Sequence, residues 1–209
     1  MDQKHIQESI SYYQEKIKKF GSSAEGMDWK NADTQYLRFD ILSRYIDFSR
    51  KPSVLDVGCG NGEFLNYCRS RNLDLNYYGV DAVPEMAAMV NDRFGMGTAE
   101  CCEFLSWQTN RKFDFVIASG TFNAKLNTTE EVWQNYFHDN IRKMFSLALT
   151  GVVFNCMTSF VDYRYDRLYY PTVQELSELA VKELSRRFVI DHSYPLYEMT
   201  MAIYSLPNA

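Results

Sequence analysis

Residues 54–64 read VLDVGCGNGEF, and this stretch decides the expected fold. Val54, Leu55 and Val57 form a short aliphatic run, which is typical of a strand buried on both faces of a parallel sheet. The three glycines that follow favour a tight turn, because glycine adopts backbone angles forbidden to other residues and lets a ligand approach the main chain. A helix over about residues 62–71 would point its free N–H groups at that turn. The stretch therefore predicts a strand, a turn and a helix that bind a nucleotide cofactor.

The glycine spacing separates two classes of cofactor. Dinucleotide-binding turns carry G-x-G-x-x-G, in which the third glycine allows the helix to pack closely on the strand. Here Glu63 occupies that third position, and an acid, Asp56, lies inside the strand. The pattern instead resembles the first motif of the class I S-adenosylmethionine (SAM) dependent methyltransferases, hh-D/E-h-G-x-G-x-G, and fills every position of it.

This resemblance implies that the glycine loop lies against the amino acid part of SAM and that the acid orients its ammonium group. The residues it assigns to the cofactor in this motif are Asp56, Gly58, Cys59, Gly60, Asn61 and Gly62. A second strand, at residues 77–80, ends at Asp81, whose carboxylate can accept hydrogen bonds from both ribose hydroxyls. We expect Ala82 beside it and Met86, one turn into the next helix, over the ribose or adenine. In the alternative interpretation, Asp81 only caps that helix and Met86 belongs to the core.

The third motif of the family resembles the segment TAECCEFLSW at residues 98–107. Aligned with it, the N–H of Phe104 would meet an adenine ring nitrogen and Glu103 would accept from the exocyclic amine. Glu100 is the alternative to Glu103.

The fourth strand, at residues 113–118, leads into the loop SGTFN at the carboxyl edge of the sheet, where ligands bind in such folds. We expect Ser119, Gly120 and Thr121 at the cofactor, and Phe122 and Asn123 at the substrate. The loop lacks the N/D-P-P-Y/F of the branches that methylate DNA bases and protein amides. The absence of this motif favours an O or N atom of a small molecule as the methyl acceptor.

The N-terminal region, residues 1–50, is expected to be a helical cap on the methyltransferase domain formed by residues 51–209. It contains one helix to about residue 20 and a second over about residues 33–48. In related enzymes a Trp followed by an Arg closes over SAM, which points to Trp29 and Arg38. A guanidinium binds a carboxylate through two parallel hydrogen bonds, so Arg38 would pair with the SAM carboxylate. The alternatives are a surface arginine and a core tryptophan.

Residues 158–171 form a Tyr-rich insertion in which Tyr163 and Tyr169 are the expected substrate contacts. A tyrosine ring offers an apolar face and one hydroxyl, which suits a sugar-like or aromatic acceptor. The alternative is that these rings pack on the core. A hydroxyl acceptor would also need a base, and His192 and Asp162 are the candidate catalytic residues, although a structural histidine is the commoner case.

Composition narrows the class of protein. The 209 residues suit one α/β domain, and the net charge of −5 with a pI near 5.3 makes nucleic acid an unlikely partner. No apolar stretch approaches the length of a membrane span, and the first residues lack the basic-then-apolar order of a signal peptide, so we expect a cytoplasmic protein. We also expect a monomer or a homodimer. The five cysteines are expected to be reduced, and Cys101 and Cys102 point to opposite faces of a strand, so no metal is predicted.

These patterns predict a Rossmann-like α/β fold. Its seven-stranded, mostly parallel sheet would have the order 3-2-1-4-5-7-6, with the last strand antiparallel and helices on both faces. The predicted activity is SAM-dependent methyl transfer to an O or N atom of a small molecule, with S-adenosylhomocysteine (SAH) as the product. An RNA or protein methyltransferase, a SAM-binding protein without activity and an NAD-binding Rossmann protein are the alternatives.

Overall fold

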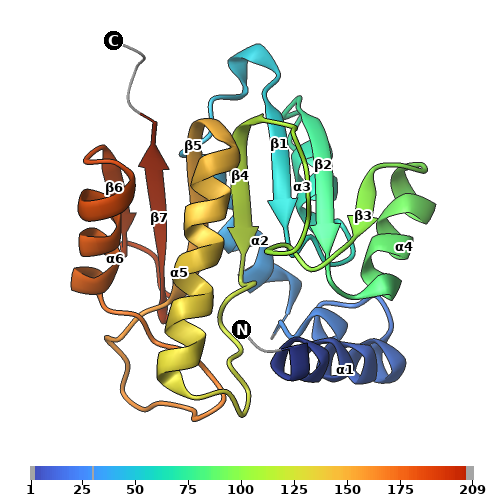
Figure 1. Ribbon diagram of the computed structural model, residues 1–209. Helices are drawn as coiled ribbons and strands as arrows, with labels where there is room; N and C mark the ends of the chain where they lie inside the picture. Colours follow the sequence, from blue (N-terminus) through green and yellow to red (C-terminus); the bar gives the residue numbers. More distant parts are fainter. Residues whose placement is uncertain (1–2, 30, 206–209) are drawn as a thin grey trace.

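The computed structural model describes residues 3–29 and 31–205. Residues 1–2 and 30 of the expected cap, and residues 206–209 of the expected methyltransferase domain, lie outside the described residues. Its centre is a seven-stranded sheet with the order β3-β2-β1-β4-β5-β7-β6 (Figure 1). The strands are β1 (Ser53–Val57), β2 (Asn76–Asp81), β3 (Ala99–Cys101), β4 (Phe113–Ser119), β5 (Ala148–Met157), β6 (Phe188–Asp191) and β7 (Glu198–Tyr204). The first five strands pair in parallel, whereas β7 runs antiparallel to both β5 and β6. The predicted order and the single reversed strand are confirmed.

Helices cover both faces of the sheet. The helices α5 (Glu130–Leu147) and α6 (Val173–Leu179) pack on one face, and α2 (Ala32–Ser43), α3 (Glu63–Ser70) and α4 (Pro84–Phe94) pack on the other. The helix α5 begins at its N-cap Thr129, which accepts a hydrogen bond from the backbone N–H of Val132. Its buried side chains recur every three or four residues, at Trp133, Phe137, Ile141 and Met144, so one stripe of the helix faces the core.

The helix α2 carries Gln35, which reaches a cavity at the carboxyl edge of the sheet. It ends at Ser43, earlier than the predicted residue 48, and the short 3₁₀ turn η2 (Phe48–Arg50) then leads to β1. The ring of Phe39 meets that of Phe64 on α3 edge to face, with 5.4 Å between centroids. This contact packs α2 against α3, and the same helix carries the buried residues Gln35 and Arg38.

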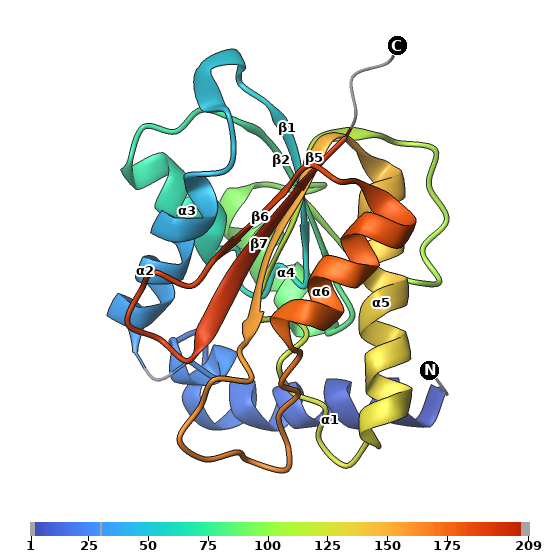
Figure 2. The same cartoon turned by 90° about the vertical axis from the view of Figure 1, so that its left-hand side faces the viewer.

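The helix α1 (Gln3–Phe20) lies across the carboxyl edge of the parallel strands rather than on either face, as Figures 1 and 2 show. The amide of Gln14 donates to the carboxylate of Glu85 at the start of α4. At the other end of the helix, the amide of Asn127 donates to Glu8. The 3₁₀ turn η1 (Glu25–Met27) then returns the chain toward α2.

The Tyr-rich segment at residues 158–171 has no regular helix and lies at the same edge of the sheet as α1. After it, Thr172 caps α6 by accepting from the N–H of Glu175. The helix continues as a π-helical segment, η3 (Ala180–Leu184).

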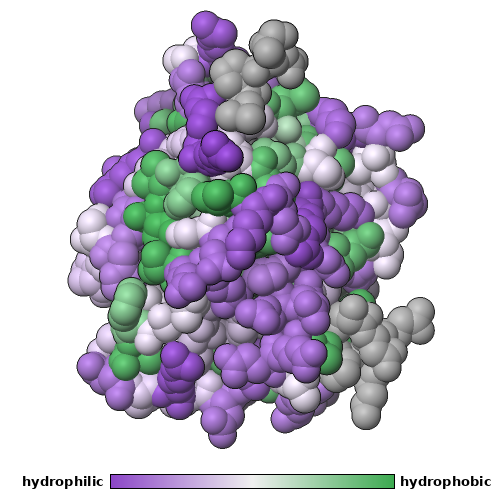
Figure 3. All heavy atoms as spheres, turned by 60° about the vertical axis from the view of Figure 1, so that its left-hand side comes forward, coloured by the Kyte–Doolittle hydropathy of each residue, from purple (hydrophilic) through white to green (hydrophobic). Residues whose placement is uncertain are grey.

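On the side of the molecule that carries α6 and β6, hydrophobic residues lie next to hydrophilic ones at the surface (Figure 3). Its exposed apolar side chains include Val181 on η3 and Val189 on the edge strand β6. Within the described residues, no helix is both long enough and apolar enough to cross a bilayer.

Candidate cofactor and acceptor site

The glycine loop between β1 and α3 is built from left-handed backbone. Gly58, Gly60 and Gly62 have φ values of 70°, 55° and 76°. A Cβ atom on Gly58 would lie 2.5 Å from Cγ2 of Thr121, so the loop after β4 touches the glycine loop directly. A Cβ atom on Gly60 would lie 3.4 Å from Sδ of Met27 and 4.0 Å from Sδ of Met86, which are ordinary contact distances. Glycine is thus required at position 58 by contact and by backbone angle.

The glycine loop forms the floor of a cavity at the carboxyl edge of the sheet. The predicted cofactor residues that line it are Trp29, Asp56, Gly58, Cys59, Gly60, Asn61, Asp81, Ala82, Met86, Phe104, Ser119, Gly120 and Thr121. Most of them come from β1 and the glycine loop, the end of β2, the segment after β3 and the end of β4 with its loop, because parallel strands end at one edge of the sheet. Trp29 precedes α2, and Met86 lies on α4. The structure brings together residues that are far apart in sequence.

Asp81 ties the floor of the cavity to the end of β2. One carboxylate oxygen accepts from the N–H of Gly60 at 2.9 Å, and the other accepts from the N–H of Val83 at 2.9 Å. Burial raises the pKa of Asp81 to about 6, although both backbone hydrogen bonds oppose the shift. Each oxygen has a second lone pair with which it can accept from a ligand hydroxyl.

Asp56 is the second buried acid of the cavity. Its carboxylate accepts from the hydroxyl of Tyr77 at 2.8 Å. The pKa of Asp56 is raised to about 7, because burial and the charge of Asp81 outweigh the hydrogen bond from Tyr77, which lowers it. A cation bound near Asp56 and Asp81 would favour the charged form of both acids.

Two polar side chains of the lining fit a bound cofactor or acceptor. The hydroxyl oxygen of Ser119 is buried and has no hydrogen-bond partner among the described residues. Gln35 is only 5% exposed and also lines the cavity. Because a buried polar group without a partner is costly, Ser119 fits a ligand that supplies the missing hydrogen bond.

The structure corrects the expectation for Glu103. The strand β3 ends at Cys101, and the Glu103 carboxylate accepts from the N–H groups of Leu105 and Ser106, at 3.1 and 2.7 Å, in the turn that follows. Glu103 is absent from the described lining of the cavity, whereas Cys102 and Phe104 are part of it. The alternative acid, Glu100, is exposed and accepts from the Tyr78 hydroxyl at 3.0 Å.

The structure also changes the expectation for Arg38. Its guanidinium does not line the cavity but forms a buried ion pair with Glu198 on β7. The sequence motif places an arginine on this helix, but nothing in it reveals that a glutamate 160 residues away is its partner.

The two candidate catalytic residues lie outside the cavity. His192 is exposed just after β6, and its ring meets that of Phe160 at a centroid distance of 5.8 Å. Asp162 is exposed in the Tyr-rich segment and accepts from the hydroxyl of Tyr197. Both are at the predicted edge of the sheet, but neither is among the residues that line the cavity.

The expected substrate contacts are likewise placed elsewhere. Phe122 is 1% exposed and packs edge to face on Phe137 in the core, so the bulky ring after Thr121 turns inward. Asn123 uses its side-chain oxygen to accept from the N–H of Met157 at 3.1 Å. Tyr169 is buried with its hydroxyl on Glu175, and Tyr163 is exposed and contacts Tyr165. The core-packing alternative holds for Tyr169.

The sequence did not reveal the wall opposite the glycine loop. Ile6, Ile10 and Tyr13 on α1 line the cavity, as do Tyr136 and Asn140 on α5. The signal for α1 is its apolar spacing of three and four residues, which is typical of a helix with one covered face. The spacing does not say which surface of the protein that face covers.

Asp28 joins this cap to the Tyr-rich segment. Its carboxylate accepts from the hydroxyl of Tyr12 at 2.8 Å and pairs with Lys16 at 2.8 Å and with Arg167 at 3.2 Å. The three partners belong to α1 and to the segment at residues 158–171, so a single carboxylate links the helix that lines the cavity to the Tyr-rich segment beside it.

Replacing Asp28 with alanine should therefore loosen α1 without unfolding the domain. We expect trypsin to cut at the lysines of α1 about tenfold faster, because local opening requires less free energy than global unfolding. The thermal midpoint should change little, since partly exposed ion pairs contribute little to stability. Asp74→Ala, which removes an exposed ion pair to Lys51, is the control. Equal cleavage rates in the two variants would contradict the role of Asp28.

Comparison with known proteins identifies the family. Residues 29–177 match the family model described as a methyltransferase domain. A Mycobacterium tuberculosis protein named as a methyltransferase is 31% identical over 153 residues, which cover 72% of this chain and 92% of that protein. The solved structure of the DhpI–SAH complex has a TM-score of 0.69 at 17% identity and covers 100% of both chains. SAM-bound CalS10, an amino pentose methyltransferase from Micromonospora echinaspora, has a TM-score of 0.62 at 14% identity, covering 82% of this chain and 91% of that one.

The family match, the sheet order and the glycine loop with its two buried acids agree with one another. The chain belongs to the class I SAM-dependent methyltransferases.

Proposed function

We propose that this enzyme binds SAM in the cavity and transfers the methyl group to an O or N atom of a small molecule. The observation that carries the proposal is the position of α1. Ile6, Ile10 and Tyr13 line the cavity from α1, which lies across the edge of the sheet at which the glycine loop is found. A site covered in this way suits a small acceptor better than a folded RNA or protein surface.

The cofactor residues have separate tasks in this proposal. Asp81 would accept from the ribose hydroxyls, and Asp56 would face the ammonium group near the glycine loop. When bound, SAM supplies a methyl group that is already activated by a positively charged sulfur. The protein then has to align the acceptor atom and exclude water, which contributes several kcal/mol to lowering a barrier.

The wall of the cavity supplies neutral groups that can orient an acceptor. Burial raises the pKa of Tyr13 and of Tyr136, so both phenols remain protonated at neutral pH. The Tyr13 hydroxyl can donate a hydrogen bond, and the Tyr136 hydroxyl, which already hydrogen-bonds Glu103, can accept one. The Ser119 hydroxyl and the Gln35 amide add two further polar contacts. An acceptor with several hydroxyl or amine groups would satisfy this arrangement.

Two further observations support a small acceptor. CalS10, which shares the fold, is named as a methyltransferase of an amino pentose. The net charge of −5 weighs against a polyanionic partner such as RNA.

The test is an acceptor screen with purified protein and SAM. Sugars, amino sugars, phenols and amines form one set, and total RNA and an unfractionated protein extract form the other. We expect SAH release together with a methylated small molecule identified by mass spectrometry. Methylation of only the RNA or protein set would refute the proposal. Calorimetric binding of SAM without any product would instead support a SAM-binding protein without activity.

A further inference from the structure

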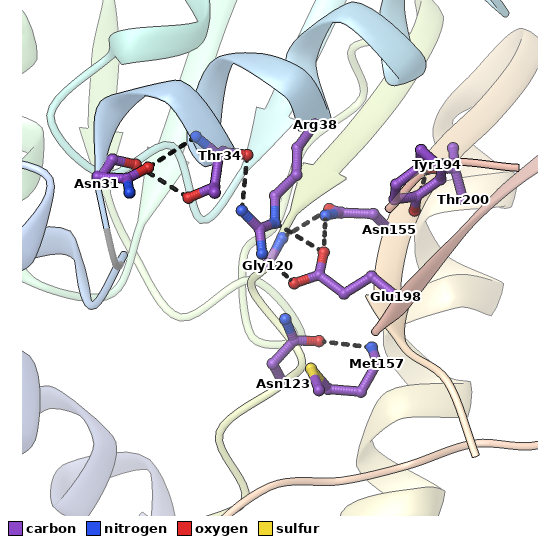
Figure 4. Close-up of polar contacts among 10 residues, drawn as sticks. All are labelled: Asn31, Thr34, Arg38, Gly120, Asn123, Asn155, Met157, Tyr194, Glu198 and Thr200. Atoms are coloured by element: carbon purple, nitrogen blue, oxygen red, sulfur yellow. Dashed lines mark hydrogen bonds and ion pairs between the residues drawn. The ribbon is translucent and has the colours of Figure 1, made fainter. Parts of the chain in front are cut away.

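Arg38 and Glu198 form a buried pair between the cap and the last strand (Figure 4). Nε of Arg38 donates to Oε2 of Glu198 at 2.8 Å, and a terminal nitrogen donates to Oε1 at 2.5 Å. The other terminal nitrogen donates to the backbone oxygen of Thr34 at 2.7 Å. Only 10% and 5% of the two side chains are exposed, so the guanidinium is held on three sides away from bulk water.

The pair continues into the loop after β4 through Asn155 on β5. The amide nitrogen of Asn155 donates to Oε2 of Glu198 at 2.7 Å, and its amide oxygen accepts from the N–H of Gly120 at 2.8 Å. Asn155 is fully buried, and its assigned amide orientation satisfies both neighbours. One hydrogen-bonded chain therefore runs from α2 through β7 and β5 to Gly120.

Trp29 closes this arrangement from the cavity side. The guanidinium carbon of Arg38 lies 4.4 Å from the centre of the Trp29 ring, within the range of a cation–π contact. A Cβ atom on Gly120 would lie only 2.1 Å from Cη2 of Trp29, so the ring rests directly against the Gly120 backbone. Trp29 and Gly120 line the cavity, whereas Arg38, Asn155 and Glu198 stand behind them.

A buried ion pair is a poor stabilising device by itself. Removing two charges from water costs free energy that their attraction repays only with good geometry, and apolar residues of similar volume are often as stable. The charges do, however, specify one arrangement, because the guanidinium is fixed by Glu198 and Thr34 and presents one face to the Trp29 ring.

We propose that Arg38, Glu198 and Asn155 are positioning residues that hold Trp29 and the Gly120 backbone as one wall of the cavity. This inference depends on the proposed function in one respect: it assumes that this wall faces the methyl acceptor. In this arrangement Arg38 acts through Trp29 and does not bind the carboxylate of SAM. Loss of the charged pair frees the Trp29 ring, and the wall then opens more readily.

The experiment compares Glu198→Leu with the double variant Arg38→Met/Glu198→Leu. The single variant leaves a buried unpaired charge and should lose thermal stability, whereas the double variant should regain most of it. The indole N–H signals of the three tryptophans are then recorded by NMR, with the Trp29 signal identified by Trp29→Phe. In both variants the Trp29 signal should shift and broaden, while the signals of Trp107 and Trp133 stay in place.

The second readout is the dissociation rate of SAH, measured by stopped-flow fluorescence. We expect dissociation to be about tenfold faster in both variants, because changes to a binding site act mostly on the off-rate. The control is Arg142→Met/Glu183→Leu, which removes an exposed pair between α5 and η3 with a contact of 2.6 Å. It should leave the Trp29 signal and SAH dissociation unchanged.

The outcomes separate the possible roles. A stable double variant with an unchanged Trp29 signal and unchanged SAH dissociation would overturn the proposal. Weaker SAH binding in Arg38→Met but not in Glu198→Leu would also overturn it, because Arg38 would then contact the cofactor directly. Neither readout needs turnover, so a failed acceptor screen would refute the proposed function without affecting this result.

Discussion

SAM binding is expected to weaken roughly 100-fold when Asp81 is replaced with alanine, since hydrogen bonds to a charged group contribute about 1.5–3 kcal/mol. Asp81 serves both the loop and the ligand. Its carboxylate holds the N–H groups of Gly60 and Val83, and it is the acid at the end of β2 that we propose for the ribose hydroxyls. Calorimetric titration with SAM and with SAH measures the loss.

Two companion variants show what the loss means. Asp81→Asn keeps one acceptor oxygen for the loop and should bind SAM more tightly than Asp81→Ala but more weakly than the parent. Asp92→Ala removes an exposed carboxylate from the same region, on α4, and should leave the affinity unchanged. Parent-like affinity in Asp81→Ala would place the ribose site elsewhere.

Replacing Asp56 with asparagine should make the protein more stable near pH 8 and yet weaken SAM binding. The carboxyl ionises near its ordinary pKa of 3.8 in the unfolded chain, whereas burial raises the pKa to about 7 in the folded protein. Folding therefore takes up a proton between these two pH values. The stability that the carboxyl contributes is present below about pH 4 and is lost as the pH rises through about 7.

Asparagine keeps an oxygen for the Tyr77 hydroxyl but cannot ionise. The free energy of unfolding at about pH 8 should rise by on the order of 2 kcal/mol, and the gain should shrink at about pH 5, where the folded parent is protonated. Denaturant unfolding at the two pH values measures this difference, with the exposed Asp92→Asn as the control. A gain of equal size at both pH values would show that ionisation of Asp56 is not its cause. SAM affinity should fall because the asparagine carries no charge for the ammonium group.

The fold was predictable because its signals are local. Mostly apolar runs such as Phe113 to Ala118 are too short for helices and too apolar for an exposed strand, so they predict a buried parallel sheet. The glycine loop and Asp81 are equally local, since a strand end and the turn beside it fix their geometry. The helix ends were less predictable, as α2 shows by stopping at Ser43.

The rest of the site depends on partners that a sequence pattern does not name. Arg38 carries a side chain suited to a carboxylate, and the carboxylate it meets is that of Glu198, from the far end of the chain. Glu103 lies two residues beyond the end of β3, in a turn where its carboxylate accepts from backbone N–H groups. Tyr169 reads equally well as a binding or a core residue, and only packing against Phe137 and Glu175 decides between them.

The contact between Arg38 and Glu198 also orders the events of biosynthesis. A ribosome makes Arg38 early and Glu198 160 residues later, so the pair cannot form until β7 has emerged and been added beside β5. The glycine loop, β2 and β4 are all made before that moment. All residues of the cavity floor are thus synthesised before the strand that supplies the partner of Arg38, and the wall formed by Trp29 gains this support only after the last strand has joined the sheet.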